Sequence, residues 1–207
     1  MDLDVFSAYS IVLPAIAGLI TYQKQIKPLK KLSGFIFIAL LLDLSGTVFA
    51  NYGLNNMWMF HCYTSLETVF LSLIFIDLLT EWKRAMTRIL LGGFCLFSLM
   101  NVIQLESMHE FNSNQRLIGG ITIIVYVMTY FFQIFQEAKI KRLEKNPFFI
   151  LSSSLLIYFT GTFFLFIFGK DAPTTVTLRL WDVHSILNIL LNIGYTLTLW
   201  MGVKKLT

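Results

Sequence analysis

The stretch Leu180–Gly202, LWDVHSILNILLNIGYTLTLWMG, is an apolar run long enough to cross a bilayer, yet it carries Asp182, His184, Asn188 and Asn192. The last three are spaced i, i+4, i+8, which places them on one face of a helix. Polar side chains are costly in hydrocarbon, so within membranes they face protein, water or a ligand. The stretch therefore predicts a membrane-spanning helix whose polar face points into a bundle of other spans.

The composition of the whole chain agrees with this prediction. Of 207 residues, 56% are apolar and 14% charged, and the mean hydropathy is +0.70. Soluble proteins are roughly 45–50% apolar and about 25% charged. The N-terminal sequence MDLDVFSAYS lacks the basic region and the cleavage pattern of a signal peptide, so we expect its apolar run to be retained. We expect an all-α fold, with residues 1–207 forming a single transmembrane domain.

Seven apolar segments have lengths near the roughly 20 residues that span a hydrocarbon core. Pro14 falls inside the first, where we expect a kink that a membrane helix tolerates. The sequence therefore predicts a polytopic seven-helix bundle. The predicted spans cover residues 5–22, 32–51, 57–80, 89–104, 117–136, 148–168 and 180–202.

The basic residues predict the orientation of this bundle. Thirteen of the sixteen lie in the tail or in loops after the first, third and fifth spans: Lys24, Lys27, Lys30, Lys31, Lys83, Arg84, Arg88, Lys139, Lys141, Arg142, Lys145, Lys204 and Lys205. The other side has only Arg116, Lys170 and Arg179. The positive-inside rule then places the N-terminus outside and the C-terminus inside a cytoplasmic (inner) membrane. This asymmetry explains the net charge of +4 and disfavours nucleic acid binding.

Several ionisable side chains fall at hydrocarbon depth. His61 and His184 are each the fifth residue of a span that runs inward, so both are expected about 6–8 Å below the outer surface. Glu67 lies two turns deeper than His61, and Asp43 lies near the midplane of the second span. Intramembrane ionisable residues indicate function by default. Asn and His side chains also join helices as interhelical hydrogen bonds, worth about 0.6 kcal/mol each.

These depths define one candidate site and three interpretations of it. The candidate ligand-binding residues are Asp43, His61, Tyr63, Glu67, Tyr158, His184, Asn188 and Asn192. In the first interpretation they line an outward-facing pocket for a small ligand, as in seven-helix receptors. Because the short loops leave no room for an output domain, a receptor would signal through a cytoplasmic protein partner that reads basic loops such as 139–145.

The other two interpretations use a cofactor. His61, His184 and Glu67 would hold Zn²⁺ with a position left for water, as in a membrane-embedded hydrolase, although no HExxH pair is present. Alternatively, the two histidines would be the axial ligands of a haem in a redox protein. A retinal pigment is disfavoured, because the last span holds no lysine for a Schiff base before Lys204. Whether the chain is an enzyme stays open at this point.

Two resemblances bear on the site. The segments NNMWMFHCYTSLE (Asn55–Glu67) and LWDVHSILNILLNIGY (Leu180–Tyr195) resemble paired segments of seven-helix bacterial membrane proteins that bring no known activity. That resemblance implies one site containing His61, Tyr63, Glu67, His184, Asn188 and Asn192. The chain also resembles lysoplasmalogenase-like membrane hydrolases through Lys27-Pro28-Leu29 before a span, through Asp43, and through His61 with Tyr63. It departs from them in helix count and in having Leu42 where a Gly-Asp pair is expected.

Overall fold

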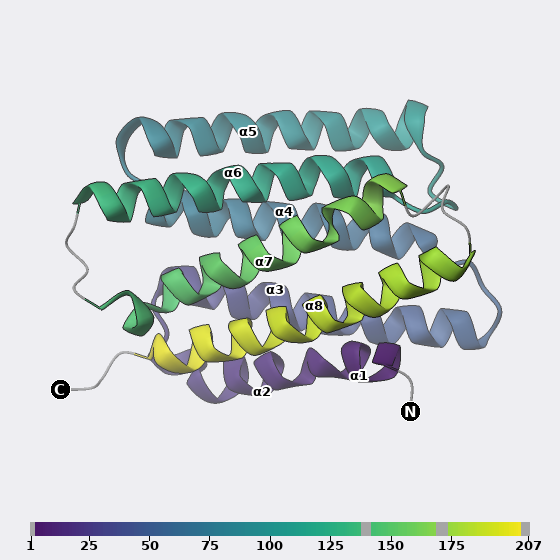
Figure 1. Cartoon of the computed structure of the whole chain (residues 1–207), viewed down its shortest axis with the longest axis horizontal. Coiled ribbons are helices and arrows are strands. Elements are labelled where there is room, and N and C mark those ends of the chain that lie inside the picture. Colours follow the sequence, from purple (N-terminus) through teal and green to yellow (C-terminus); the bar gives the residue numbers. More distant parts are fainter. Residues whose placement is uncertain (1–2, 138–141, 169–173, 204–207) are drawn as a thin grey trace.

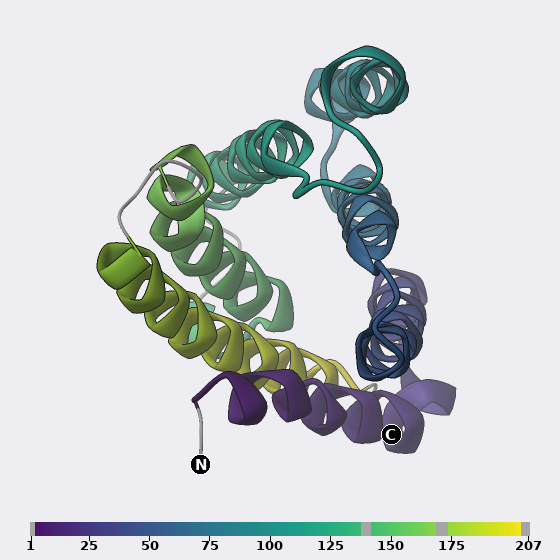
Figure 2. The ribbon, with the colours of Figure 1, turned by 90° about the vertical axis from the view of Figure 1, so that its right-hand side faces the viewer.

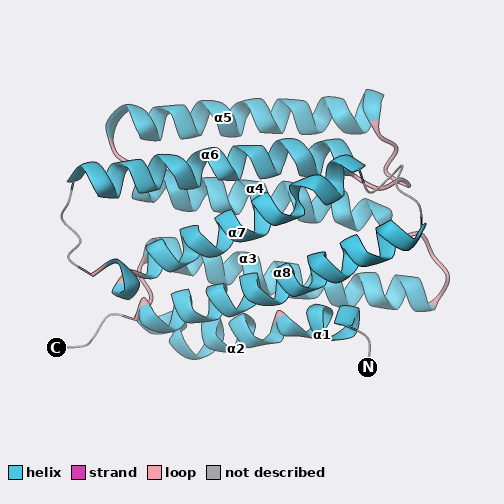
Figure 3. Ribbon diagram, in the orientation of Figure 1, coloured by secondary structure: helices cyan, strands magenta, loops and turns pink. Residues whose placement is uncertain are grey.

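A computed structural model of the protein describes residues 3–137, 142–168 and 174–203, and these are helical apart from short connections (Figure 3). No strand occurs in these ranges, although an isolated β-bridge pairs Gln25 with Val203. The predicted all-α fold is therefore confirmed. Five of the basic residues named above, Lys139, Lys141, Lys170, Lys204 and Lys205, lie outside the described residues.

The helices follow the predicted spans, most of them with longer ends. Their bounds are α1 (Leu3–Ser10), α2 (Val12–Thr21), α3 (Lys27–Asn51), α4 (Met57–Leu78), α5 (Glu81–Met100), α6 (Ser113–Glu137), α7 (Pro147–Phe168) and α8 (Thr174–Met201). Short turns of 3₁₀-helix cover Tyr22–Lys24 and Leu143–Lys145, and a π-helical turn, Asn101–Leu105, extends α5.

Within the described residues, six helical segments are long and apolar enough to cross a membrane. The α1–α2 pair counts as one of them, and the others are α3, α4, α5 with its π turn, α6, and α8 from Arg179. The span predicted at 148–168 corresponds to α7, of which a shorter apolar stretch, Pro147–Phe163, is described. These apolar helices indicate a multi-pass membrane protein in contact with a lipid bilayer.

The first span is broken where its proline predicts. Pro14 has no N–H to give to the carbonyl of Ser10, and its ring crowds that carbonyl. The helical hydrogen bonding is accordingly interrupted at Ile11, between α1 and α2, although the Ile11 backbone stays in the helical region, and it resumes with Ala15 N–H donating to Ile11 O (3.2 Å).

The spans predicted at 57–80 and 89–104 imply a basic loop at residues 81–88. That prediction is wrong, because these residues form the first two turns of α5. Lys83 extends over the ring of Phe132 at 5.4 Å and donates to Gln136 Oε1 (3.4 Å), both on α6. Thr87 donates to the carbonyl of Lys83 (2.9 Å). Hydropathy predicts only the apolar part of a helix, whereas these side-chain contacts stabilise the polar turns that precede the apolar part of α5.

The helices form a ring with one helix outside it. Seen end-on, α1–α2, α3, α4, α6, α7 and α8 follow one another round the ring, and α8 closes it by packing on α1 and α2 (Figure 2). Helix α5 lies outside, against α4 and α6 (Figures 1 and 2). Close packing joins α7 to α8, since a Cβ at Gly194 would lie 2.0 Å from Ser154 Oγ.

The interior of the ring is filled near one end only. Along α3, the buried residues are Leu29, Leu32, Ser33, Phe35, Ile36 and Ala39, all in its first half, and no residue from 40 to 51 is buried. The filled end carries the connections with Lys24 and with Arg142 and Lys145 (left in Figure 1). The opposite end is where polar side chains gather.

Candidate functional site

A cavity of about 520 Å³ lies inside the ring at the end where α4, α6 and α8 begin. Helices α1, α3, α4, α6, α7 and α8 all contribute to its wall. Its aromatic side chains are Phe60, Tyr63, Phe111, Tyr158, Trp181 and His184, and its charged ones are Asp4, Asp43 and Arg116. This volume is within the roughly 300–1,000 Å³ of small-molecule sites.

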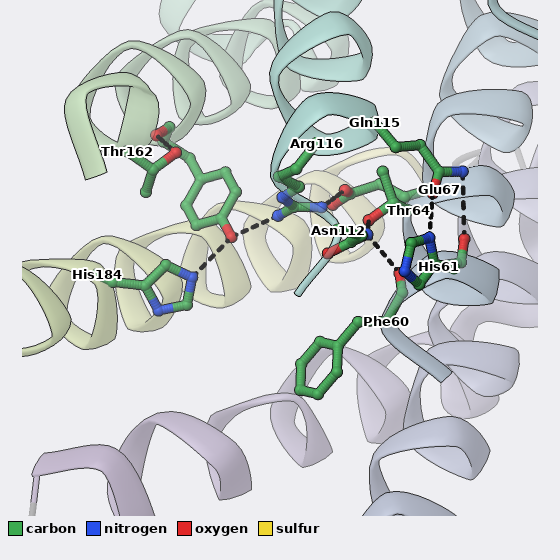
Figure 4. Close-up of polar contacts among 10 residues, drawn as sticks. Phe60, His61, Thr64, Glu67, Asn112, Gln115, Arg116, Thr162 and His184 are labelled. Carbon is green, nitrogen blue, oxygen red and sulfur yellow. Dashed lines mark hydrogen bonds and ion pairs between the residues drawn. The ribbon is translucent and has the colours of Figure 1, made fainter. Parts of the chain in front are cut away.

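A chain of polar contacts crosses the wall of this cavity and joins four helices (Figure 4). Arg116, in the first turn of α6, forms an ion pair through Nη1 with Glu67 on α4. Its Nη2 donates to Tyr158 Oη on α7 (2.7 Å), and that oxygen lies 3.2 Å from His184 Nε2 on α8. The four side chains therefore link α4, α6, α7 and α8 at one level.

The Arg116–Glu67 pair is buried, with side-chain exposures of 7% and 1%. The rings of Tyr63, Tyr158 and Phe159 lie 5.5–5.8 Å from the guanidinium carbon. A buried charge is tolerated when it is paired, and aromatic faces add a further attraction for a cation. The second carboxylate oxygen, Glu67 Oε1, accepts no hydrogen bond from the described residues.

Asp43 differs from Glu67 in having no such partner. It lines the cavity, it is exposed, and its carboxylate forms no ion pair or hydrogen bond within the described ranges. The hydroxyl of Thr47, one turn later, donates to the backbone carbonyl of Asp43 instead (2.9 Å).

His61 belongs to a separate network that does not line the cavity. Its side chain is buried, with Nδ1 3.1 Å from Gln115 Oε1 and Nε2 3.2 Å from the carbonyl of Glu110. Gln115 in turn donates to Ser65 and Ser98 Oγ, each at 2.6 Å. These bonds tie the start of α4 to α5, to α6 and to the loop before α6.

The two histidines are therefore not brought together as a cofactor site. Both ring nitrogens of His61 face Gln115 and Glu110, whereas Nε2 of His184 faces Tyr158. Among the described residues, no three His, Cys, Asp or Glu side chains are grouped as a metal ion requires. The arrangement expected for Zn²⁺ on His61, His184 and Glu67, and that expected for a haem between the histidines, are not the arrangements found.

The polar stripe of α8 mostly faces α1. Three hydrogen bonds join the helices in parallel register, from Ser185 Oγ to Asp4 Oδ1 (2.6 Å), from Asn188 Nδ2 to Ser7 Oγ (3.0 Å) and from Asn192 Nδ2 to Ser10 Oγ (2.7 Å). Asn188 also lines the cavity, whereas Asn192 lies beyond it. Part of the predicted inward stripe is thus an interhelical seam.

Of the eight residues predicted for the site, five line the cavity: Asp43, Tyr63, Tyr158, His184 and Asn188. Glu67 reaches it through Arg116, and His61 and Asn192 are engaged elsewhere. Arg116 and Asn112 line the cavity but were not among the predicted site residues; Asn112 donates to Thr64 Oγ1 (2.7 Å). A signal for Arg116 was present, because it is one of only three basic residues on the side poor in them.

No family model matches the chain, and neither a curated protein nor a solved structure gives a match. The two resemblances seen in the sequence therefore receive no support from these comparisons, and the function has to be argued from the site.

Proposed function

We propose that the chain is a single-domain, seven-helix receptor-like protein of the cytoplasmic membrane, which binds a small molecule in the cavity and signals through a cytoplasmic protein. The observation that carries this proposal is the cavity of about 520 Å³ whose wall includes Asp43, Tyr63, Tyr158 and His184. Apolar and aromatic walls with a few convergent polar groups are typical of small-molecule sites.

The contact chain supports a sensing role. Tyr158 and His184 both line the cavity and both belong to the chain that links α4, α6, α7 and α8. A ligand that bonds to either side chain competes with a link between helices. Its binding free energy then depends on how those helices sit, which is the requirement for a ligand to shift a conformational equilibrium.

The opposite end of the same helices supplies a surface for a partner. Helix α7 is preceded there by Arg142 and Lys145, and α3 begins there with Lys27, Lys30 and Lys31. We place this end in the cytoplasm by the positive-inside rule. A reporter fused after Thr207 should accordingly be active only in the cytoplasm, and activity on the outer side would overturn the orientation.

Ligand binding is tested on purified protein in lipid nanodiscs with a panel of cationic, anionic and neutral amphiphiles. Trp181 lines the cavity, so its fluorescence should change as a ligand enters. Tyr158→Phe keeps the ring and removes the hydroxyl, and should weaken binding about three- to tenfold. Tyr9→Phe removes an exposed hydroxyl outside the cavity and serves as the matched control. A panel without any saturable response refutes the proposal.

Signalling is tested by amide hydrogen exchange at residues 142–150, at the far end of α7. A bound ligand should change exchange there in the wild type, and less in Tyr158→Phe at equal occupancy. Exchange that responds only around the cavity would show binding without transmission and would remove the receptor role.

A further inference from the structure

Asp43 occupies an unusual position for an unpaired carboxylate. It follows Leu40-Leu41-Leu42 in α3 and lies eight residues before the helix end at Asn51, or about 12 Å at 1.5 Å per residue. An intramembrane carboxylate is normally neutralised by a partner. Asp43 has none among the described residues, and it faces the cavity. A cation that enters the cavity can therefore supply the counter-charge that the described residues do not.

The other charged side chains of the cavity wall do not neutralise the Asp43 carboxylate. Arg116 is the one basic residue in the cavity wall, as far as the structure describes it, and it is paired with Glu67. Asp4, the remaining charged residue of the wall, accepts a hydrogen bond from Ser185. The cavity therefore has an excess of negative charge, which attracts a cation.

The aromatic side chains of the cavity wall indicate which class of cation fits the cavity. Phe60, Tyr63, Tyr158 and Trp181 line the same space as Asp43. Aromatic faces attract ammonium groups, and several together form the cages that recognise alkylated ammonium ions. An organic ammonium group fits this wall better than a small metal cation, which needs clustered oxygen ligands.

Helices α1 and α3 both line the cavity but do not pack closely on each other, which leaves room for a sideways opening between them. The α1–α2 span crosses the ring obliquely, so that α2 packs on α3 near the basic end while α1 packs on α8 (Figure 2). Gly18 of α2 meets Ser33 of α3, its Cβ position lying 3.1 Å from Ser33 Oγ. Towards the cavity no equivalent packing covers α3, whose Leu41, Leu44 and Val48 are 51–63% exposed.

Both edges of this opening belong to the cavity wall, and each combines small or apolar residues with one aspartate. On α1, Ser7 bonds to α8, and the next residue, Ala8, lines the cavity and is exposed. On α3, Asp43 and Thr47 line the cavity one turn apart, while Gly46 faces Met59 and Asn56. A hydrocarbon chain can extend through the opening over the exposed Leu44 and Val48 of α3, while a cationic head stays beside Asp43.

We propose that the ligand is an ammonium compound carrying an apolar chain, that it reaches the cavity from the bilayer between α1 and α3, and that its ammonium group pairs with Asp43 inside the aromatic wall. This inference rests on the proposed ligand-binding function and specifies its ligand. The ammonium group is common to two sources, a single-chain amphiphile and the headgroup of a bilayer lipid.

The test uses the full chain in phosphatidylglycerol nanodiscs, whose lipid has no ammonium group. Decyltrimethylammonium is the probe, and decyl sulfate and decyl maltoside are its chain-matched controls. Trp181 fluorescence should report saturable binding of the cation and much weaker binding of the controls. Asp43→Asn should lower the affinity for decyltrimethylammonium roughly ten- to hundredfold, as expected for losing a charged hydrogen bond. Asp43→Glu should retain binding, and Asp182→Asn, outside the cavity wall, should match the wild type.

The route is tested by kinetics on matched variants of α1. Ala8→Phe narrows the sideways opening and should slow decyltrimethylammonium binding at least about tenfold, and much more than it slows tetramethylammonium, which needs no passage for a chain. Val5→Phe adds a ring at an exposed position that does not line the cavity, and it should behave as the wild type. Equal rates for Ala8→Phe and Val5→Phe would overturn the sideways route.

The remaining outcomes separate the two proposals. Decyl sulfate or decyl maltoside binding as tightly as the cation, with Asp43→Asn unchanged, overturns the ammonium ligand but leaves a ligand-binding cavity. No saturable binding of any of these probes, or of the wider panel, overturns the proposed function itself. Adding phosphatidylcholine to the nanodisc identifies the source, since competition assigns the site to a lipid headgroup and its absence to a separate amphiphile.

Discussion

Glu67→Gln should be among the most destabilising single substitutions at the cavity. The variant keeps the shape of the side chain and removes its charge, so Arg116, 7% exposed, is left as a buried cation without a carboxylate. Removing one partner of a buried ion pair costs about 3–5 kcal/mol, because the other charge stays desolvated and uncompensated. We expect a loss of that size in the free energy of unfolding.

The double variant Glu67→Gln with Arg116→Met removes both charges and keeps most of the volume. Replacing both partners of a buried pair with uncharged groups is often neutral or stabilising. The free energy of unfolding of the double variant should therefore lie within about 1 kcal/mol of the wild-type value or above it. Equilibrium unfolding in mixed micelles, followed by circular dichroism, measures all four members of this cycle.

The chain contains a matched control for burial. Lys31 and Asp77 form an ion pair of 2.7 Å in which both side chains are 21% exposed. Partly hydrated pairs contribute about 0–1 kcal/mol, so Asp77→Asn should cost at most about 1 kcal/mol. Equal losses for Glu67→Gln and Asp77→Asn, or a double variant no more stable than Glu67→Gln, would refute a buried and coupled Arg116–Glu67 pair.

Three further predictions concern packing and the second network. Asn192→Leu should cost only about 0.6 kcal/mol, the average for an interhelical hydrogen bond in a membrane, and leave ligand binding unchanged in the nanodisc titration. Gly194→Ala should lower the free energy of unfolding by about 1–3 kcal/mol through overpacking against Ser154, with partial recovery in the double variant Gly194→Ala/Ser154→Gly. Gly92→Ala, with nothing within 4 Å of its Cβ, should instead raise the free energy of unfolding by up to about 1 kcal/mol. His61→Ala should lower the free energy of unfolding by about 1–3 kcal/mol, because buried acceptors lose their partner. Ligand affinity should stay unchanged, and a loss of affinity would place His61 in the site.

Much of the fold follows from hydrophobic length and a few punctuating residues. Apolar runs near 20 residues predicted the helices, and Pro14 predicted the break in the first span. The ring could not be predicted in the same way, because lipid and protein interior are both apolar and hydropathy does not tell one helix face from another. The place of α5 outside the ring is the clearest example, since it is as apolar as its neighbours.

The candidate site was predicted in part, because ionisable groups at hydrocarbon depth can be found by counting along a span. The matching depths of His61 and His184 were counted from span starts at residues 57 and 180, whereas α8 begins at Thr174. Depth also fixes only one coordinate and leaves the direction around the helix open. His61 turns towards Gln115 and Glu110, and His184 turns towards Tyr158, so the prediction of equal depth does not bring the histidines together.

The pairing of Arg116 with Glu67, and not with Asp43, decides which carboxylate of the site is left without a partner. The sequence predicts Asp43 and Glu67 at similar depth and Arg116 just outside the fifth span, and no pattern in it shows that Arg116 pairs with either carboxylate. The start of α6 packs on α4, which carries Glu67, whereas α3, which carries Asp43, lies one position further round the ring. Because one guanidinium cannot neutralise both, the order of helices in the ring leaves the negative charge on Asp43, beside the opening to the bilayer. The chemistry expected of the ligand thus depends on the order of the helices, a property that composition and spacing do not encode.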